Sequence, residues 1–299
     1  ELGKFCHAEQ FDIVITHRFK AFDIMSKLNI FLAIPHAINV VHNLDDFSRF
    51  YRKLNTFFFL NPRWTIVAVS QTVNNYLCSV GYGFNKKNTI TINNAIDADK
   101  LLSRIYPREK ARKQLALDNK SFVFGTIGRT VSVKGHIYLI KAFEQLYSHN
   151  KNIKLIIIGD GKLTTELQQY IDTHGLHNAV SLPGAIVDAK LLIAAFDCFV
   201  LSSLAEGFSL VILEAMAAKV PIVATRVGIV PSIISAQDES IAPKDIEKLS
   251  LVMQKYSIMP SAERSAIGES LQQCLLDNFD NKLYRKNYLK LIKEKTKSL

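Results

Sequence analysis

Short runs of apolar and β-branched residues alternate along this chain with stretches of helical periodicity. Such an alternation is typical of α/β proteins, in which helices cover both faces of a parallel sheet. In the first part, strands are expected at residues 12–16, 38–42, 65–69 and 89–92, and helices at 18–29, 45–60 and 71–80. In the second part, strands are expected at 121–128, 154–159, 179–182, 198–203 and 221–225, and helices at 135–148, 163–174, 188–196 and 208–218.

A polar, charged stretch at residues 97–120 interrupts this rhythm. We place a domain boundary near its end, which gives a first domain over residues 1–118 and a second from residue 119. A chain of 299 residues with 48% apolar composition is long enough to bury two cores. The sequence therefore predicts two Rossmann-like domains in tandem. Sheets of this kind bind ligands beyond the carboxyl ends of their strands, so a ligand is expected in a cleft between the domains.

The charge balance favours an anionic partner. Lys and Arg total 37 against 27 Asp and Glu, a formal net charge of +10, which suits a nucleotide diphosphate, an anionic lipid or a nucleic acid. The basic run at residues 282–297 fits a solvated helix face as well as a membrane-touching one. Nucleic acid is the weakest of the three partners, because the charge is spread out and no aromatic–basic platform occurs.

Cysteine usage and hydropathy indicate the cellular compartment and the kinds of site that are not expected. The four cysteines are scattered and form no CxxC pair, which argues against a disulfide framework or a zinc site and favours a reducing, cytoplasmic compartment. No apolar stretch has the length of a membrane span, and no signal peptide is visible. The chain begins at Glu1 rather than Met and in the middle of a pattern, so we expect an N-terminal part to be missing.

The strongest local signal lies at residues 206–214, between an expected strand and an apolar helix. The first-turn amides near Phe208, Ser209 and Leu210 can bind a phosphate through their N–H groups and the helix dipole. Glu206 precedes the helix, and Glu214, eight positions later, can accept hydrogen bonds from two vicinal hydroxyls of a ribose. Taken alone, the pair fits a helix cap and a solvated glutamate better than a ligand site.

A second signal lies at residues 128–135, directly after an expected strand. Arg129 can hold a phosphate with its planar fork, and Lys134 adds a point charge. Gly128 and Gly135 let the backbone approach a ligand closely. In isolation, this loop fits a basic, solvent-facing connection equally well.

Two weaker signals follow further strands. The Gly-Asp-Gly turn at residues 159–161 is common turn chemistry. The segment 180–184 ends at Gly184, where a nucleotide base could rest against the backbone. Together with the two stronger signals, these segments occupy the carboxyl ends of four strands of one sheet.

In this order and spacing, the motifs resemble those of the GT-B glycosyltransferases, in particular the retaining family 4, or glycosyl transferases group 1. That family has a G-R-x(4)-K-G loop, a G-D-G turn, a V-x-F-x-G strand end and an E-x(7)-E element, and all four occur here, with Leu182 in place of the usual Phe. The resemblance is strong over residues 121–230. It implies a GT-B fold of two Rossmann-like domains facing each other across a cleft.

The resemblance assigns roles to the donor half, residues 119–280. Arg129 and Lys134 would neutralise the donor diphosphate and assist its departure. Glu206 would contact the donor sugar, and Glu214 would hold the ribose. Donor contacts are further expected from the backbone of Gly128, Gly184, Phe208, Ser209 and Leu210.

A metal ion and a cofactor are not needed in this scheme, because cations and a helix start take the place of the metal. The triplet Asp97-Ala98-Asp99 has the form of a metal-binding motif of other transferases. However, residues 94–97 resemble the segment that ends the first domain in family 4, so a linker role is favoured.

The acceptor half, residues 1–118, resembles the family less closely. His42 matches the place of a histidine that follows a central strand and faces the donor sugar, although a histidine that merely ends a strand fits equally well. His17 ends an earlier strand and is a weaker candidate for the acceptor side. The family's early Gly-rich loop is absent, so this domain is expected to be incomplete. Residues 281–299 are expected to form a helix that returns to it, with an apolar stripe at Tyr284, Tyr288, Leu291 and Ile292.

A further departure is the segment 228–232, which lacks the second glycine and the glutamate of the family's Gly-Gly-[Val/Ile]-Pro-Glu motif. The resemblance implies a retaining, metal-independent hexosyltransferase that uses a nucleotide-diphosphate sugar. Its acceptor would be a glycan or glycolipid of lipopolysaccharide or another surface polysaccharide, handled in the cytoplasm or at the inner face of an anionic membrane. A non-catalytic nucleotide-sugar-binding module and a GT-B sugar-nucleotide epimerase are the alternatives.

Overall fold

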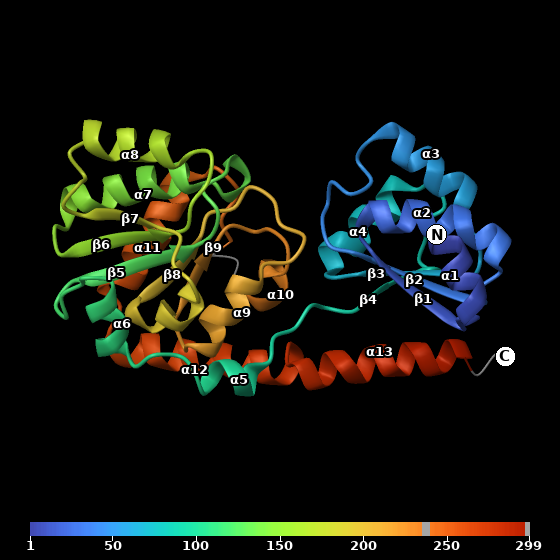
Figure 1. Ribbon diagram of the computed structural model, residues 1–299. Helices are drawn as coiled ribbons and strands as arrows, with labels where there is room; N and C mark the ends of the chain where they lie inside the picture. Colours follow the sequence, from blue (N-terminus) through green and yellow to red (C-terminus); the bar gives the residue numbers. More distant parts are fainter. Residues whose placement is uncertain (235–239, 297–299) are drawn as a thin grey trace. The chain divides into compact units, whose positions relative to one another are not determined.

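The computed structural model describes residues 1–234 and 240–296, and the chain divides into two compact units (Figure 1). Unit 1 comprises Glu1–Asn94, Glu206–Phe208 and Lys282–Leu299, and unit 2 comprises Ala95–Ala205 and Ser209–Asn281. Each unit is built on one parallel sheet, so the α/β class and the pair of Rossmann-like sheets are confirmed. Within the described residues, every helix is too short or too polar to cross a membrane.

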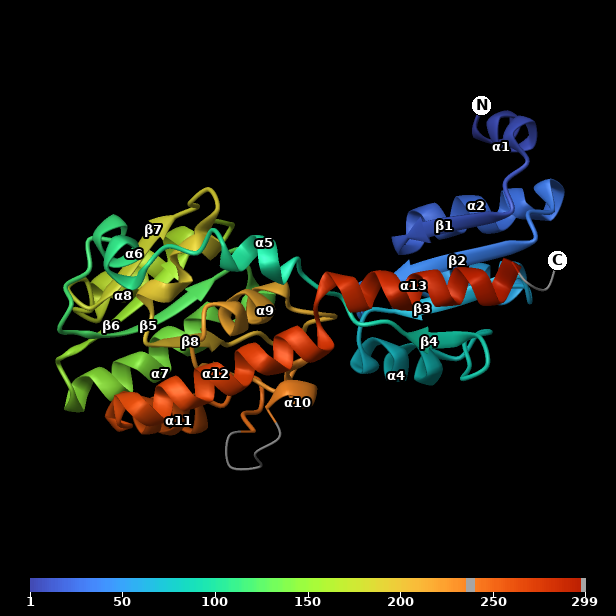
Figure 2. The ribbon, with the colours of Figure 1, turned by 90° about the horizontal axis from the view of Figure 1, so that it is seen from below.

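Unit 1 has a four-stranded sheet in the order β1-β2-β3-β4. The strands are β1 (Ile13–His17), β2 (His36–Val41), β3 (Trp64–Ala68) and β4 (Thr89–Thr91). The helices are α1 (Leu2–Glu9), α2 (Arg18–Leu32), α3 (Phe50–Phe59), α4 (Gln71–Val80) and α13 (Asn281–Thr296). Figure 1 shows α2 and α3 on one face of this sheet and α13 on the other, and Figure 2 shows α13 lying along β2 and β3.

An aromatic cluster forms much of the core of unit 1. Trp64, the only tryptophan of the chain, starts β3 and lies edge-to-face with Phe22 of α2 at a centroid distance of 4.9 Å. Phe47 packs on Phe22 and is fully buried with it. From the other side, Leu291 of α13 is buried against the same core, together with the expected stripe of tyrosines and Ile292. Lys297 and Ser298, included in the expected basic run and helix, lie outside the described residues.

Unit 2 has a five-stranded sheet in the order β7-β6-β5-β8-β9. The strands are β5 (Phe122–Ile127), β6 (Ile153–Ile158), β7 (Val180–Gly184), β8 (Cys198–Leu201) and β9 (Ile222–Ala224). The helices are α5 (Ala98–Leu102), α6 (Arg108–Gln114), η1 (Ser132–Lys134), α7 (His136–His149), α8 (Thr164–Thr173), η2 (Ala189–Ala195), α9 (Leu210–Ala217), α10 (Val230–Ile233), α11 (Ile246–Ile258) and α12 (Ser261–Asn278). Figure 1 shows α7 and α8 on one face of the sheet, and α6 and α12 on the other.

The structure divides the chain earlier than the expected boundary near residue 118, because it groups Ala95–Ala205 with unit 2. The polar stretch at residues 97–120 contains a buried residue that holds it to unit 2. Arg112 of α6 is fully buried, pairs with Asp197 at 2.6 Å, and donates to the carbonyl of Ala195 at 3.0 Å. A charged residue in this position looks like a linker residue in the sequence, but its ion pair ties α6 to the sheet.

The structure differs from expectation at further places. The segment expected as an α-helix at 188–196 is the 3-10 helix η2, closed by an i to i+3 bond from Leu191 N to Asp188 O (2.8 Å). The helix expected from residue 45 begins only at Phe50, because Asp45 and Asp46 lie in a turn before it. The first helix, α1, lacks the clear periodicity that would have predicted it.

Candidate active site

Three loops of unit 2 are bonded to one another at the carboxyl edge of its sheet. After β5, the amide of Thr130 donates to Asp160 O (3.1 Å) in the loop that follows β6. The amide of Gly159 in turn donates to Gly184 O (2.8 Å) at the end of β7. The signals found in the sequence around Gly128, Gly159 and Gly184 therefore lie side by side, as the carboxyl-end rule predicts.

Gly159 is required by this packing. Its φ of 145° lies in a region that other residues rarely adopt, and a Cβ there would stand 1.9 Å from Gly128 O. Asp160 beside it caps its own turn, since its carboxylate accepts from the Gly161 amide and from Thr164 Oγ1, both at 2.7 Å. The Gly-Asp-Gly turn thus shapes the edge, and its carboxylate is engaged internally.

The loop after β5 presents the two predicted cations differently. Arg129 is exposed, while Thr130 beneath it is fully buried and shares a 2.6 Å hydrogen bond with Thr164. The aliphatic stem of Lys134 crosses Gly128, where a built Cβ would lie 3.8 Å from its Cδ and Cε atoms. The stem of Lys134 is thereby held over the end of β5, and the exposed guanidinium of Arg129 extends from the same loop.

The cationic loop is also fixed to the segment that follows β8. Leu204 N donates to Val133 O (2.7 Å), and Ser202 Oγ donates to Lys134 O (3.0 Å). Gly135 makes this approach sterically feasible, because its φ is 64° and a Cβ would stand 2.2 Å from Ser202 O. The two strongest sequence signals, 128–135 and 206–214, are therefore joined through residues 202–204.

The start of α9 carries a polar group without a partner. Ser209 is buried at the N-cap position, and its hydroxyl has no hydrogen-bond partner among the described residues. Leu210, the first residue of α9, is exposed. Glu214 is half-buried on the same helix; burial raises the pKa of its carboxyl, and the nearby Lys190 opposes that shift. A buried hydroxyl of this kind is costly unless a ligand or water satisfies it.

Glu206 and Phe208 group with unit 1, whereas Ser209, Leu210 and Glu214 belong to unit 2. Both Glu206 and Phe208 are half-buried. The predicted donor residues are therefore divided between the two units along one continuous segment of chain.

In unit 1, the two histidines predicted from the sequence meet each other. His17 Nδ1 and His42 Nε2 lie 2.9 Å apart, at the ends of the neighbouring strands β1 and β2, and the rings are stacked. Burial, with the nearby charges of His17 and Arg18, lowers the pKa of His42. Because one ring nitrogen must accept this bond, the arrangement favours at least one neutral imidazole.

Two residues near these sites were missed in the sequence. His136, the first residue of α7, is buried with its Nδ1 unpartnered, and burial together with Lys134 lowers the pKa of its imidazole to about 4. Asp46 in unit 1 is buried with Oδ2 unpartnered, and burial raises the pKa of its carboxyl. In the sequence, the only sign of His136 or Asp46 is that a polar residue stands close to a candidate site residue.

The Asp-x-Asp triplet has a structural role in this fold. Asp97 caps α5 by accepting from the Lys100 amide (3.1 Å), and Ala98 between the two carboxylates is buried. No cluster of three or more His, Cys, Asp or Glu side chains suited to a metal occurs among the described residues.

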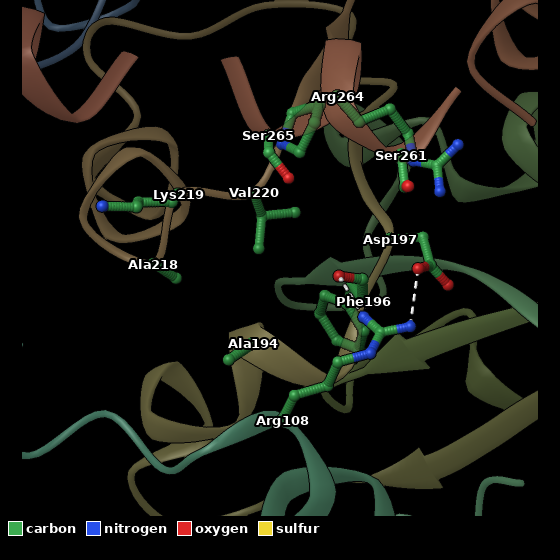
Figure 3. A pocket seen from close by; sticks show the side chains of 11 residues that line it. Arg108, Ala194, Phe196, Asp197, Ala218, Lys219, Val220, Ser261, Arg264 and Ser265 are labelled. Carbon is green, nitrogen blue, oxygen red and sulfur yellow. Dashed lines mark hydrogen bonds and ion pairs between the residues drawn. The ribbon is translucent and has the colours of Figure 1, made fainter. Parts of the chain in front are cut away.

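A cavity of about 430 Å³ lies at the other edge of the same sheet, where β8 and β9 begin (Figure 3). Asp197 lies in its wall and pairs with Arg108 at 2.6 Å as well as with the buried Arg112. These ion pairs fasten α6 to the sheet, so Arg108 and Asp197 of this cavity already have structural partners.

A family model described as glycosyl transferases group 1 matches residues 107–272, more than half of the chain. Among curated proteins, an uncharacterized glycosyltransferase of Methanocaldococcus jannaschii is 33% identical over 181 residues, which are 60% of this chain and 44% of that protein. The Escherichia coli UDP-Gal:alpha-D-GlcNAc-diphosphoundecaprenol alpha-1,3-galactosyltransferase is 27% identical over 242 residues, 76% of this chain and 61% of that enzyme. The chain thus spans about half the length of these two relatives.

Among solved structures, Anabaena HepE in complex with UDP matches with a TM-score of 0.87 at 22% identity, over 98% of this chain and 81% of that chain. This likeness shows the fold, which is that of the GT-B glycosyltransferases. The family model covers all five strands of unit 2 and the edge on which its loops converge. This chain therefore belongs to the glycosyl transferases group 1.

Proposed function

We propose that this chain transfers a hexose from a nucleotide-diphosphate sugar to a glycan or glycolipid acceptor, with retention of configuration and without a metal ion. The observation that carries the proposal is the carboxyl edge of unit 2, where mutually bonded loops present Arg129 and the stem of Lys134. Two cations held by one short loop suit a diphosphate.

In the proposed reaction, the bond between the sugar's anomeric carbon and the diphosphate oxygen breaks, and the electron pair leaves with the diphosphate. Arg129 and Lys134 stabilise the growing negative charge. The acceptor hydroxyl forms its new bond on the same face of the sugar, and its proton goes to the departing phosphate oxygen. Glu206 and His42 are assigned to the sugar's hydroxyls.

The remaining donor contacts are assigned around the start of α9. The amides of Phe208, Ser209 and Leu210 donate to phosphate oxygens, and the unpartnered hydroxyl of Ser209 gains its missing hydrogen bond there. The half-buried carboxylate of Glu214 accepts from the ribose hydroxyls. Gly184, which has a φ of 78° and open space beside its Cα, offers a flat backbone surface to the base.

For the acceptor, we propose a lipid-linked or surface glycan, as in lipopolysaccharide or capsule synthesis, handled at the cytoplasmic face of the membrane. The name of the Escherichia coli relative specifies a diphosphoundecaprenol-linked acceptor, and its UDP-sugar makes uridine nucleotides the first donors to test.

The test measures nucleotide-diphosphate binding by thermal shift and sugar transfer by product analysis on the same preparations. Lys134→Ala should lose both binding and turnover, and Glu206→Ala should keep nucleotide binding while turnover falls about 100-fold or more. Lys151→Ala and Glu247→Ala, away from the edge, serve as matched controls. Full turnover in both site variants would reject the proposal.

The same measurements separate the alternatives. If the full-length protein binds the nucleotide but transfers no sugar, the chain is a non-catalytic binding module. A changed sugar nucleotide formed without acceptor would identify an epimerase.

A further inference from the structure

Helix α3 of unit 1 exposes its aromatic residues instead of burying them. Phe50, Phe57 and Phe58 are 66%, 61% and 71% exposed, and the only buried residue of the helix is Thr56. Phe50, Phe57 and Phe58 follow the i, i+7, i+8 spacing of one helix side. The apolar side of this amphipathic helix therefore faces away from the core.

Helix α2 adds a stripe of the same character. Lys20, Ile24, Lys27 and Phe31 follow the i, i+4, i+7, i+11 spacing of a single helix side, and Phe31 is 86% exposed. Cations and apolar side chains thus alternate along this helix.

The two helices form one surface. Asn55 of α3 donates to Asp23 of α2 at 2.8 Å, and Lys27 Nζ lies 5.6 Å from the ring centre of Phe59. Figure 1 shows the helices side by side on one face of the unit 1 sheet. We name this surface the aromatic–basic face, comprising Lys20, Ile24, Lys27, Ile30 and Phe31 of α2 with Phe50, Lys53, Phe57 and Phe58 of α3.

The two helices carry a large excess of positive charge. They carry five cations (Arg18, Lys20, Lys27, Arg52 and Lys53) and a single carboxylate, a net charge of +4. That carboxylate, Asp23, is already paired with Lys27 at 2.8 Å. By contrast, none of the described aromatic residues of unit 2 is exposed.

We propose that the aromatic–basic face docks on an anionic lipid bilayer, with the phenylalanines at the boundary of headgroups and acyl chains and the lysines against lipid phosphates. Exposed aromatic rings flanked by lysines on a non-spanning helix are the composition of an interfacial helix. Clustered apolar rings of this size mark an interaction site, and the net positive charge of the two helices favours a negatively charged partner. Docking would bring the enzyme to a lipid-linked acceptor, and only this benefit rests on the proposed function.

The test is co-sedimentation of the whole chain with vesicles of phosphatidylglycerol and phosphatidylcholine, compared with phosphatidylcholine alone. Binding is expected on the anionic vesicles at about 0.1 M salt and should weaken strongly at about 1 M, where screening shortens the reach of charges. Phe57→Ser/Phe58→Ser should reduce the vesicle partition constant about 100-fold, since each ring contributes about tenfold. Lys20→Glu/Lys53→Glu should reduce it by about 20-fold or more.

Two matched controls locate the effect. Val187→Ser/Ile258→Ser removes apolar side chains that are at least as exposed, but on unit 2, and should leave binding unchanged. Arg285→Glu/Lys286→Glu alters the exposed basic run of α13 and should reduce binding less than the α2–α3 variants.

Several outcomes would overturn the proposal. These are no binding to anionic vesicles, unchanged binding of the phenylalanine variant, or loss of binding only in the α13 variant. A dimer in sedimentation velocity that the phenylalanine variant abolishes, without vesicle binding, would assign the face to a second copy of the chain. Nucleotide binding measured on the same samples keeps a failure here distinct from a failure of the proposed transferase activity.

Discussion

The two units place their chemistry on different parts of a similar architecture. Unit 2 concentrates it at the carboxyl edge of the sheet, where loops are bonded through their backbones and no described aromatic residue is exposed. Unit 1 instead leaves aromatic rings exposed on the outer side of its helices, while a histidine pair ends two of its strands. In the two proposals made above, the sheet edge of unit 2 holds a diphosphate and the helical face of unit 1 docks on a membrane surface.

The largest effect that tests this division concerns α6. Arg112→Met should destabilise unit 2 by about 3–5 kcal/mol, because it leaves Asp197 without its buried partner. Urea unfolding followed by circular dichroism should shift, while fluorescence of the sole tryptophan, Trp64, reports on unit 1. Arg104→Met removes an exposed pair and should cost less than about 1 kcal/mol. A shift seen only by Trp64 would contradict the assignment of α6 to unit 2.

The next effect concerns the bonded loops of unit 2. Gly159→Ala should cost about 2–4 kcal/mol, because the new Cβ meets Gly128 O and the φ is unfavourable. Gly175→Ala is the matched control, since its φ is also positive but nothing lies within 4 Å of the new atom, and about 1–2 kcal/mol is expected. Equal losses in urea unfolding would show that the close approach to Gly128 is unimportant.

Acid should weaken unit 2 through His136. Its pKa of about 4 in the folded chain lies below the ordinary value of 6.5, so the unfolded chain binds the proton more readily. Stability is therefore full above pH 6.5 and falls as the pH decreases towards 4, with a loss of about 2 kcal/mol between pH 7 and pH 5. In His136→Asn, the difference between unfolding free energies at these two pH values should shrink by that amount. An unchanged difference would show that His136 does not titrate in this way.

The smallest effect is expected on unit 1. Because Phe57 and Phe58 are largely exposed, Phe57→Ser and Phe58→Ser should each change stability by less than about 0.5 kcal/mol. Phe22→Ala, in the core beside Trp64, should cost about 3–5 kcal/mol. A large loss in the α3 variants, measured by Trp64 fluorescence in urea, would mean that these rings support the fold.

Periodicity and motif order predicted much of this molecule. The position of every strand followed from short apolar runs, within a few residues at either end. The neighbouring placement of Gly128, Gly159 and Gly184 followed from the rule that parallel strands end at one edge. The assignments of Arg129, Lys134, Glu206, Glu214 and His42 to a donor sugar remain predictions.

Other features depend on tertiary packing that local pattern does not record. Arg112 has the appearance of a solvated linker residue, and only the fold brings Asp197 to it. The meeting of His17 and His42 requires β1 and β2 to be neighbours. The exposure of the phenylalanines of α3 depends on which side of this amphipathic helix faces the sheet, and composition alone does not tell this.

The bond between Leu204 and Val133 has a consequence for redesign. The backbone next to Lys134 is hydrogen-bonded to the segment that leads to Glu206. A change of length in the loop of either residue would therefore displace both charged side chains. Under the proposed function, exchanging one of these loops to retarget the sugar would also disturb the contacts to the phosphates, so the two loops would have to be exchanged as a pair.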